Sequence, residues 1–321
     1  MKTEQTELDA NELNLVELAQ QYSDNDKARE LLESLRWPNG PVCPHCQNDG
    51  KAKPIYRLEP KATSKAPARK GVYKCGACRK QFTVTVGTVF EASHIPISKW
   101  LLAVFILCSG KKSTSSHQMH RMLKVTYKTA WFMTHRIRFA MGLDDSDAPP
   151  LTGTVECDET YVGGKGDMKT KVVRKTPVIA LVQRGGAVRT QVVPNVTQLN
   201  LRKIITAFVS KSATLNTDDS GVYRGRFKDY ARHDIVNHSN FEYTRQNADG
   251  TKSGVNGCES FFSLLKRGVV GSWHHVSREH LPKYAGEFEF RWNTRGISDG
   301  ARMVKAIESV EGKRLTYRQV V

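Results

Sequence analysis

The sequence predicts an α/β protein in which a mixed sheet, flanked by helices, forms the C-terminal domain and smaller metal-binding and helical regions precede it. Three observations predict this fold class. Strand and helix patterns alternate after residue 154, two Cys-x-x-Cys pairs lie near the N-terminus, and segments with helical periodicity lie between them. With 321 residues, 39% of them hydrophobic, the chain is long enough for two packed domains.

The chain is strongly basic, with 49 Lys and Arg residues against 32 Asp and Glu residues and a net charge of +17. Such a balance favours a polyanionic partner, because binding to phosphates releases counterions. The longest apolar run, residues 100–108, has about half the length that a membrane span requires. The first residues are polar and acidic, unlike a signal peptide. We therefore expect a cytoplasmic protein that does not interact with a membrane.

Residues 1–40 are expected to form an N-terminal helical segment. Apolar residues at helical spacing predict a helix over 15–37, which the polar residues 23–25 can divide into two. The Pro-Asn-Gly sequence at 38–40 then ends the helix.

Residues 41–92 are predicted to form a zinc ribbon. The chain has seven cysteines, an odd number that argues against a purely disulfide-bonded framework. Two Cys-x-x-Cys pairs can supply four thiolates to one tetrahedral structural Zn²⁺, and these are Cys43, Cys46, Cys75 and Cys78. The basic segment 47–74 is expected to be an extended loop that can lie along a phosphate backbone. Alternating apolar residues in 81–89 predict a pair of strands that completes the ribbon.

Residues 93–143 are predicted to contain a helix-turn-helix. A buried helix over 100–108 is followed by a capping box at Ser115, a short helix, a three-residue turn and a second helix from Thr126 onward. This is the plan of a helix-turn-helix DNA binder, although periodicity alone would also allow a simple helical hairpin. Basic residues of the second helix are expected on its outer side as DNA contacts, namely Lys128, His135, Arg136 and Arg138. Residues 144–153 are expected to be a linker.

Residues 154–300 are predicted to form the sheet domain, and residues 301–321 to be a C-terminal tail. A helix is expected over 199–209, between the third and fourth strands, and two more helices over the last third of the chain. The expected strands cover 154–162, 178–182, 188–193, 213–217 and 235–237.

Acidic residues occur in these elements where a packed core does not need them. Asp158 stands within the first strand, Asp218 and Asp219 end the fourth, and Glu259 lies in a later helix. A buried carboxylate is costly unless it is paired or binds a metal, and the simpler alternative is an edge strand with its acids in water. Carboxylates that converge from several elements are what a two-metal phosphoryl-transfer site requires.

Four segments resemble the catalytic domain of insertion-sequence DDE transposases, in particular the ISXO-type group with an upstream zinc ribbon and helix-turn-helix. These segments are CDETYVGGK, NTDDSGVY, VNGCESFFSLLKRG and REHLPKYAGEFEFRWNTR, and the likeness extends from about residue 14 to residue 295. The resemblance implies an RNase H-like catalytic domain over 154–300. It also implies that Asp158, Asp218 and Glu259 bind the metal ions and that Lys266 neutralises a phosphate.

The implied activity is that of a DNA transposase, which binds the ends of its insertion sequence and catalyses DNA strand cleavage and strand transfer. Two Mg²⁺ (or Mn²⁺) ions, double-stranded DNA of the element ends and the target, and a homo-oligomer on DNA are the implied cofactors and partners. Asp218 is preferred to Asp219, which is expected to cap the following turn. Glu159 is expected to face away from Asp158, whereas Glu156 shares its face.

Two other classes of protein remain open from the sequence. One is a DNA-binding regulator whose nuclease-like domain is inactive, and the other is a ribonuclease or structure-specific nuclease with the same metal site. The presence of three acids favours an active enzyme over the regulator. The predicted DNA-binding region favours a transposase over the other nucleases.

Overall fold

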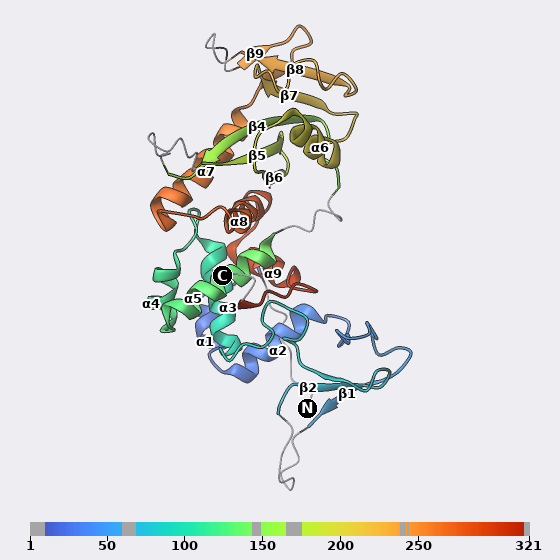
Figure 1. The fold of residues 1–321 in the computed structure, drawn as a ribbon. Coiled ribbons are helices and arrows are strands. Elements are labelled where there is room, and N and C mark those ends of the chain that lie inside the picture. The colour runs from blue at the N-terminus through green and yellow to red at the C-terminus, as the bar shows by residue number, and fades with distance from the viewer. Residues whose placement is uncertain are drawn as a thin grey trace. The chain divides into compact units, whose positions relative to one another are not determined.

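The structure is a computed structural model that describes residues 10–59, 69–142, 149–164, 175–237, 242 and 244–317 (Figure 1). Contacts within the chain divide it into two units. The first comprises Met1–Met141 together with Gly296–Val321, and the second comprises Gly142–Arg295. Most of the expected linker, residues 143–148, lies outside the described residues.

The first unit is mainly helical. The division expected near residues 23–25 is confirmed, because Asp24 caps the second helix by accepting hydrogen bonds from the N–H groups of Asp26 and Lys27. The helices of this unit are α1 (Leu15–Gln21), α2 (Asn25–Arg36), α3 (Ile97–Ser109), α4 (Ser116–Leu123), α5 (Tyr127–Met141) and α9 (Asp299–Glu308).

The prediction that residues 301–321 form a tail was wrong. Helix α9 is capped by Ser298 and buries Met303 and Ile307 within the first unit. The Arg302 guanidinium donates a hydrogen bond to the Cys108 carbonyl of α3, over 2.9 Å. The apolar residues of α9 have helical spacing, so the sequence did contain the signal for this element.

A small antiparallel sheet joins the two cysteine pairs. Its strands are β1 (Ile55–Leu58), β2 (Val72–Cys75) and β3 (Gln81–Phe82), in the order β1-β2-β3. The prediction of a strand pair over 81–89 was wrong beyond residue 82. There the Thr88 hydroxyl donates to the Thr85 carbonyl (2.6 Å) and accepts from the Phe90 N–H (3.1 Å), which makes turns. The alternating apolar residues of this segment do pack inward, but the backbone that carries them forms turns and not strands.

The second unit contains the five-stranded mixed sheet that the sequence predicts. The strand order is β6-β5-β4-β7-β8, in which β6, β5 and β4 are antiparallel and β4, β7 and β8 are parallel. This arrangement is consistent with an RNase H-like fold. The strands are β4 (Thr154–Val162), β5 (Thr176–Gln183), β6 (Val188–Val192), β7 (Thr214–Asp218) and β8 (Arg232–Val236).

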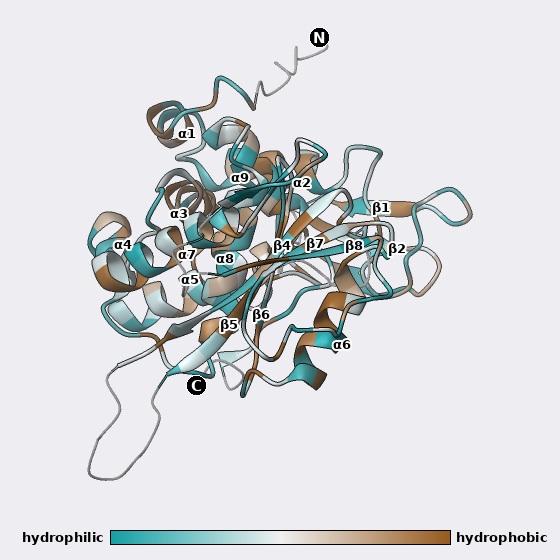
Figure 2. Ribbon diagram, turned by 90° about the horizontal axis from the view of Figure 1, so that it is seen from above, coloured by the Kyte–Doolittle hydropathy of each residue, from teal (hydrophilic) through white to brown (hydrophobic). Residues whose placement is uncertain are grey.

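Helices cover both faces of this sheet (Figure 1). On one face, Val155 and Cys157 of β4 pack with the buried side of α6 (Gln198–Phe208), a helix in which Figure 2 shows both hydrophobic and hydrophilic residues. On the other face lie α7 (Asn256–Gly268), a π-helical turn (Val269–Trp273) and α8 (Leu281–Asn293). Side chains alternate along a strand, so Glu156 and Asp158 of β4 belong to the α7 face.

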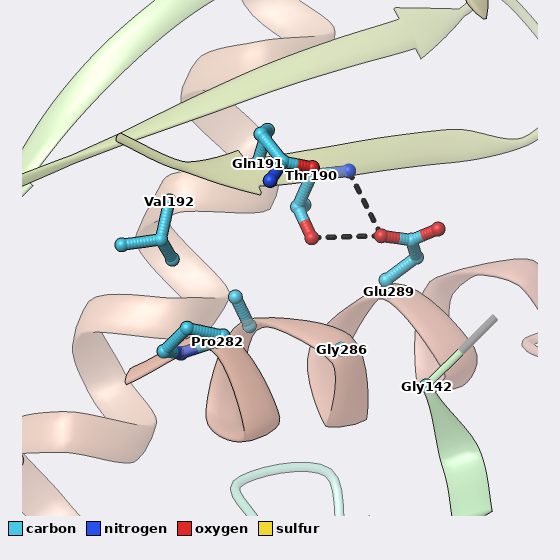
Figure 3. A pocket seen from close by; sticks show the side chains of 8 residues that line it. Gly142, Thr190, Gln191, Val192, Pro282, Gly286 and Glu289 are labelled. Carbon is cyan, nitrogen blue, oxygen red and sulfur yellow. Dashed lines mark hydrogen bonds between the residues drawn. The ribbon is translucent and has the colours of Figure 1, made fainter. Parts of the chain in front are cut away.

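Side chains of α8 complete the hydrogen bonding of the edge strand β6. The Glu289 carboxylate accepts hydrogen bonds from the N–H (2.8 Å) and the hydroxyl (2.7 Å) of Thr190 (Figure 3). The Val188 N–H donates to the Asn293 side chain over 2.8 Å. An exposed strand edge is a template for unwanted pairing, and these bonds cover it.

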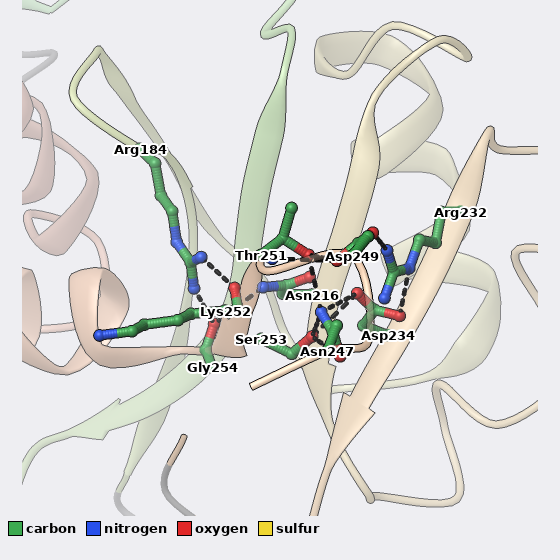
Figure 4. Close-up of polar contacts among 10 residues, drawn as sticks. All are labelled: Arg184, Asn216, Arg232, Asp234, Asn247, Asp249, Thr251, Lys252, Ser253 and Gly254. Atoms are coloured by element: carbon green, nitrogen blue, oxygen red, sulfur yellow. Dashed lines mark hydrogen bonds and ion pairs between the residues drawn. The ribbon is translucent and has the colours of Figure 1, made fainter. Parts of the chain in front are cut away.

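A hairpin of β9 (Thr244–Gln246) and β10 (Lys252–Gly254) leads from β8 to α7. The buried Ser253 hydroxyl donates to the Asp234 carboxylate over 2.8 Å, and Arg232 forms an ion pair with the same carboxylate (Figure 4). These contacts fix the strand that immediately precedes α7.

Candidate active site and metal centres

Asp158 and Asp218 lie at the same level on adjacent parallel strands. Glu156 of β4 pairs with Asn216 of β7, and Asp158 and Asp218 follow two residues later on their strands. Because side chains alternate, both aspartates project from the α7 face of the sheet. Each is partly buried.

Helix α7 brings the third predicted acid to this face. Glu259 lies in its first turn, and Lys266 follows two turns later. Asp158, Glu259 and Lys266 line one groove, which has a volume of about 640 Å³. Three of the four residues predicted to be catalytic therefore share a groove, and Asp218 stands on the strand next to Asp158.

The charges of the acids act on one another. Burial, together with the negative charges of Glu159, Asp218 and Glu259, raises the pKa of Asp158 to about 7, although a hydrogen bond from the Glu159 N–H (2.8 Å) acts in the opposite direction. Mutual repulsion of this kind is relieved by a cation between the carboxylates. Oxygen-only ligands suit a hard divalent cation, so the residues present fit Mg²⁺ or Mn²⁺.

Within the described residues, the ligand atoms of only one group, the four cysteines, all lie within 4.8 Å of one another. The carboxylates of Asp158, Asp218 and Glu259 are therefore spread more widely than the cysteine sulfurs.

The neighbouring acids have other partners. Glu159 faces away from α7, as predicted, and accepts a hydrogen bond from the Tyr223 hydroxyl over 2.6 Å. The prediction that Asp219 caps the following turn was wrong. Asp218 itself accepts the Ser220 N–H over 3.1 Å, while Asp219 forms an ion pair with Arg224 at 3.5 Å. A side chain that bonds the N–H two residues ahead is typical of Asp in turns.

The four predicted zinc ligands come together in the first unit. The sulfur atoms of Cys43 and Cys78 are 3.7 Å apart, as are those of Cys46 and Cys75, and all four lie within 4.8 Å of one another. Four sulfurs at about 2.3 Å from one zinc in a tetrahedron are about 3.8 Å apart. The cluster therefore fits one structural Zn²⁺ well.

Backbone groups prepare the cysteine turns for a metal. The Gln47 N–H donates to the Cys43 carbonyl and the Arg79 N–H to the Cys75 carbonyl, each over 2.9 Å. N–H groups of Cys78 and Ala77 also hydrogen-bond the Cys75 sulfur, and they lower the pKa of this thiol to about 6. Since the thiolate is the form that binds zinc, these bonds favour the metal-binding state at Cys75, whereas burial raises the pKa of Cys43 to about 12.

Comparison with known proteins finds family matches over both regions. The ISXO2-like transposase domain matches residues 150–293, and the transposase zinc-ribbon domain matches residues 23–81. An uncharacterized protein in transposable element ISH50 of Halobacterium salinarum (strain ATCC 700922 / JCM 11081 / NRC-1) is 31% identical over an alignment of 286 residues that covers 83% of this chain and 90% of that protein. The chain belongs to the ISXO2-like transposases.

The transposase has the two helices expected for a helix-turn-helix, α4 and α5, but their exposed residues differ from those predicted. Lys128 is exposed at the start of α5, whereas His135, Arg136 and Arg138 are 0%, 5% and 0% exposed. The prediction that these three lie on the outer side was wrong. Arg138 donates to the Thr114 carbonyl over 3.2 Å.

The C-terminal segment explains part of this burial. The Arg136 guanidinium donates to the Leu315 carbonyl over 3.1 Å and lies 4.4 Å from the centre of the Phe132 ring. Helix α5 therefore contacts α3, α4 and α9 within the first unit, and more than one of its sides is covered.

The helix pair of the transposase keeps a polar exposed surface around its turn. Lys124, in the turn, adopts a left-handed conformation (φ 48°). The rings of His117 and Tyr127 stack with their centres 4.2 Å apart across α4 and α5. The exposed polar residues of this surface are His117, Gln118, Arg121, Lys124, Tyr127 and Lys128. No helix among the described residues of the transposase is both long and apolar enough to cross a membrane.

Proposed function

We propose that this transposase binds the ends of its insertion sequence and catalyses metal-dependent cleavage and transfer of DNA strands. The observation that carries the proposal is the meeting of Asp158, Asp218 and Glu259, from two adjacent strands and a helix, on one face of the sheet. Three separate elements supply these acids, and the packing of the core does not require them. A basic residue also lines the groove beside them.

Each residue has a task in this chemistry. Two Mg²⁺ ions, when bound, activate the attacking oxygen and stabilise the leaving oxygen of the phosphodiester. Asp158, Asp218 and Glu259 would hold these ions with their carboxylate oxygens. Lys266, exposed on the groove side of α7, would neutralise a non-bridging phosphate oxygen. The groove, open to solvent on its outer side, would admit the DNA backbone.

DNA binding is assigned to the first unit. Its zinc ribbon and helix-turn-helix carry exposed basic and aromatic residues, and the whole chain has a net charge of +17. Lys128 at the start of the second helix is the candidate contact retained from the sequence, because the first residues of such a helix reach the major groove. We also propose that the transposase works as a homo-oligomer on DNA, since an insertion sequence has two ends to be joined.

Cleavage of a labelled element-end duplex by the purified full chain tests the proposal. With Mg²⁺, the wild type should nick at the element end and join that end to a second duplex. Glu259→Gln should bind the same duplex as tightly as the wild type without cutting it. The alternative, a DNA-binding regulator with an inactive nuclease-like domain, predicts binding by both proteins and cleavage by neither, with Mg²⁺ or with Mn²⁺.

A further inference from the structure

Helix α7, which carries Glu259, begins without a cap of its own. Its N-cap residue is Val255, and no side-chain cap hydrogen bond is made there. The first N–H groups of a helix need acceptors from elsewhere. Glu156 of β4 supplies one, because its carboxylate Oε2 accepts the N–H groups of Gly257 (2.6 Å) and Cys258 (3.3 Å). A carboxylate at this end of a helix also interacts favourably with the helix dipole.

An arginine balances the charge of this carboxylate. Glu156 is only 2% exposed, and Arg184 Nε donates to its other oxygen over 2.8 Å. The same guanidinium donates to the carbonyl groups of Lys252 and Gly254 in β10, the strand that leads into α7 (Figure 4). A buried carboxylate is tolerated when it is paired and fully hydrogen-bonded. The Glu156–Arg184 pair therefore joins β4, β10 and the first turn of α7.

The first turn of α7 also lies unusually close to the sheet. A Cβ atom at Gly257 would stand 2.8 Å from Glu156 Oε2 and 3.1 Å from a Val182 methyl group, so any other residue there would displace the Glu156 carboxylate. The Cys258 sulfur contacts the Glu156 carbonyl at 3.4 Å. Together these contacts fix the height of the helix start above β4.

We propose that Glu156 is a positioning residue that sets the separation between Asp158 and Glu259. Asp158 lies two residues after Glu156 on β4. Glu259 lies two residues after Gly257, and the Gly257 N–H donates a hydrogen bond to Glu156. Through these two short connections, Glu156 determines where the two acids stand and hence how tightly they hold a divalent cation. This inference rests on the proposed function, in which Asp158 and Glu259 bind the metal ions.

Direct binding of Mn²⁺ tests the inference without relying on catalysis. Mn²⁺ is titrated into the zinc-loaded full chain, and the unbound ion is counted from its electron paramagnetic resonance signal. Glu156→Gln preserves the shape of the side chain and removes its charge. It should weaken Mn²⁺ binding about 10- to 100-fold, the usual effect of losing a group that orients metal ligands. DNA binding and zinc content should not change.

Glu289→Gln is the matched control. Glu289 is also a buried carboxylate (5% exposed), bonded to a backbone N–H and 3.7 Å from an arginine, Arg189. It lies at the β6 edge of the sheet, where it accepts a hydrogen bond from the Thr190 hydroxyl (Figure 3). A general loss of stability would appear in both variants. Weaker Mn²⁺ binding in Glu156→Gln alone supports a positioning role.

Three results would overturn either the role of Glu156 or the metal site on which it rests. Wild-type Mn²⁺ affinity in folded Glu156→Gln would overturn the inference and leave Glu156 a merely structural group. If Glu156→Gln does not fold, Arg184→Gln replaces it, since Arg184 is about one-third exposed. Folded Arg184→Gln with wild-type affinity would overturn the inference equally. Equal Mn²⁺ binding by the wild type and Glu259→Gln would instead overturn the metal site itself, and the role of Glu156 with it.

Discussion

At the residue scale, two adjacent aspartates show how backbone geometry divides roles. Asp218 is the last residue of β7 and stands beside Asp158 on the α7 face. Asp219 follows the strand, and its carboxylate lies 3.5 Å from the Arg224 guanidinium. The Arg224 side chain is 64% exposed and the Asp219 side chain 22% exposed, so the arginine side of this ion pair is in water. Of these two aspartates, Asp218 is the one that projects from the same face of the sheet as Asp158.

We predict that Asp218→Asn abolishes cleavage of an element-end duplex, whereas Asp219→Asn keeps most of it. Loss of an exposed ion pair should change the free energy of unfolding by no more than about 1 kcal/mol. Cleavage rates and thermal unfolding of both variants measure the difference. An inactive Asp219→Asn beside an active Asp218→Asn would show that the second acid is misassigned.

Buried and exposed basic residues of α5 should also behave differently. Lys128→Ala should leave stability within about 0.5 kcal/mol of the wild type and lower the salt dependence of DNA binding by about one phosphate contact. Arg138→Ala removes a fully buried side chain and its bond to Thr114, so it should cost more than about 2 kcal/mol of stability. Chemical denaturation and binding at several salt concentrations measure both. A stable Arg138→Ala with a reduced salt slope would contradict this assignment.

Local patterns predict some of these residues and not others. The opposite directions of Asp158 and Glu159 follow from the two-residue period of a strand, which the sequence displays directly. The bond from Glu156 to the start of α7 joins residues about a hundred positions apart, and no local pattern contains it. The burial of Arg136 likewise depends on Leu315, in the segment expected to be a C-terminal tail.

At the scale of elements, the zinc ribbon is a small structure with few internal contacts. Its sheet has three strands of two to four residues. The rings of Trp37, Tyr73 and Phe82 form its aromatic packing, with centres 5.4 to 5.9 Å apart. Such a short sheet buries too little apolar surface to be stable by itself. The metal is therefore expected to supply much of its folding free energy.

We predict that the purified protein contains about one zinc per chain, as a four-cysteine site requires. Cys75→Ser should lose this zinc, and chelation of the wild type should unfold the ribbon while hydrogen-exchange protection of β4 and β5 persists. Metal analysis and hydrogen exchange measure the two effects. Zinc retained in full by Cys75→Ser would show that these cysteines are not its ligands.

At the scale of the whole molecule, the proposed function gives the two units different tasks. Residues 142–295 carry the acids, and the zinc ribbon and the α4–α5 helix pair lie in the unit formed by residues 1–141 and 296–321. The alternation of strands and helices predicts the mixed sheet, because each element has its own period. It does not predict that the C-terminal residues return to the first unit, because that choice depends on the packing of α9 against α3.

The central claim is that Asp158, Asp218 and Glu259 together bind the catalytic ions. The most direct test is anomalous scattering from crystals of the protein grown with element-end DNA and Mn²⁺. We expect two manganese positions about 3.5–4 Å apart, each bound by at least one of the three carboxylates and by the scissile phosphate. Manganese bound elsewhere, or none at these acids while the DNA occupies the groove, would contradict the account.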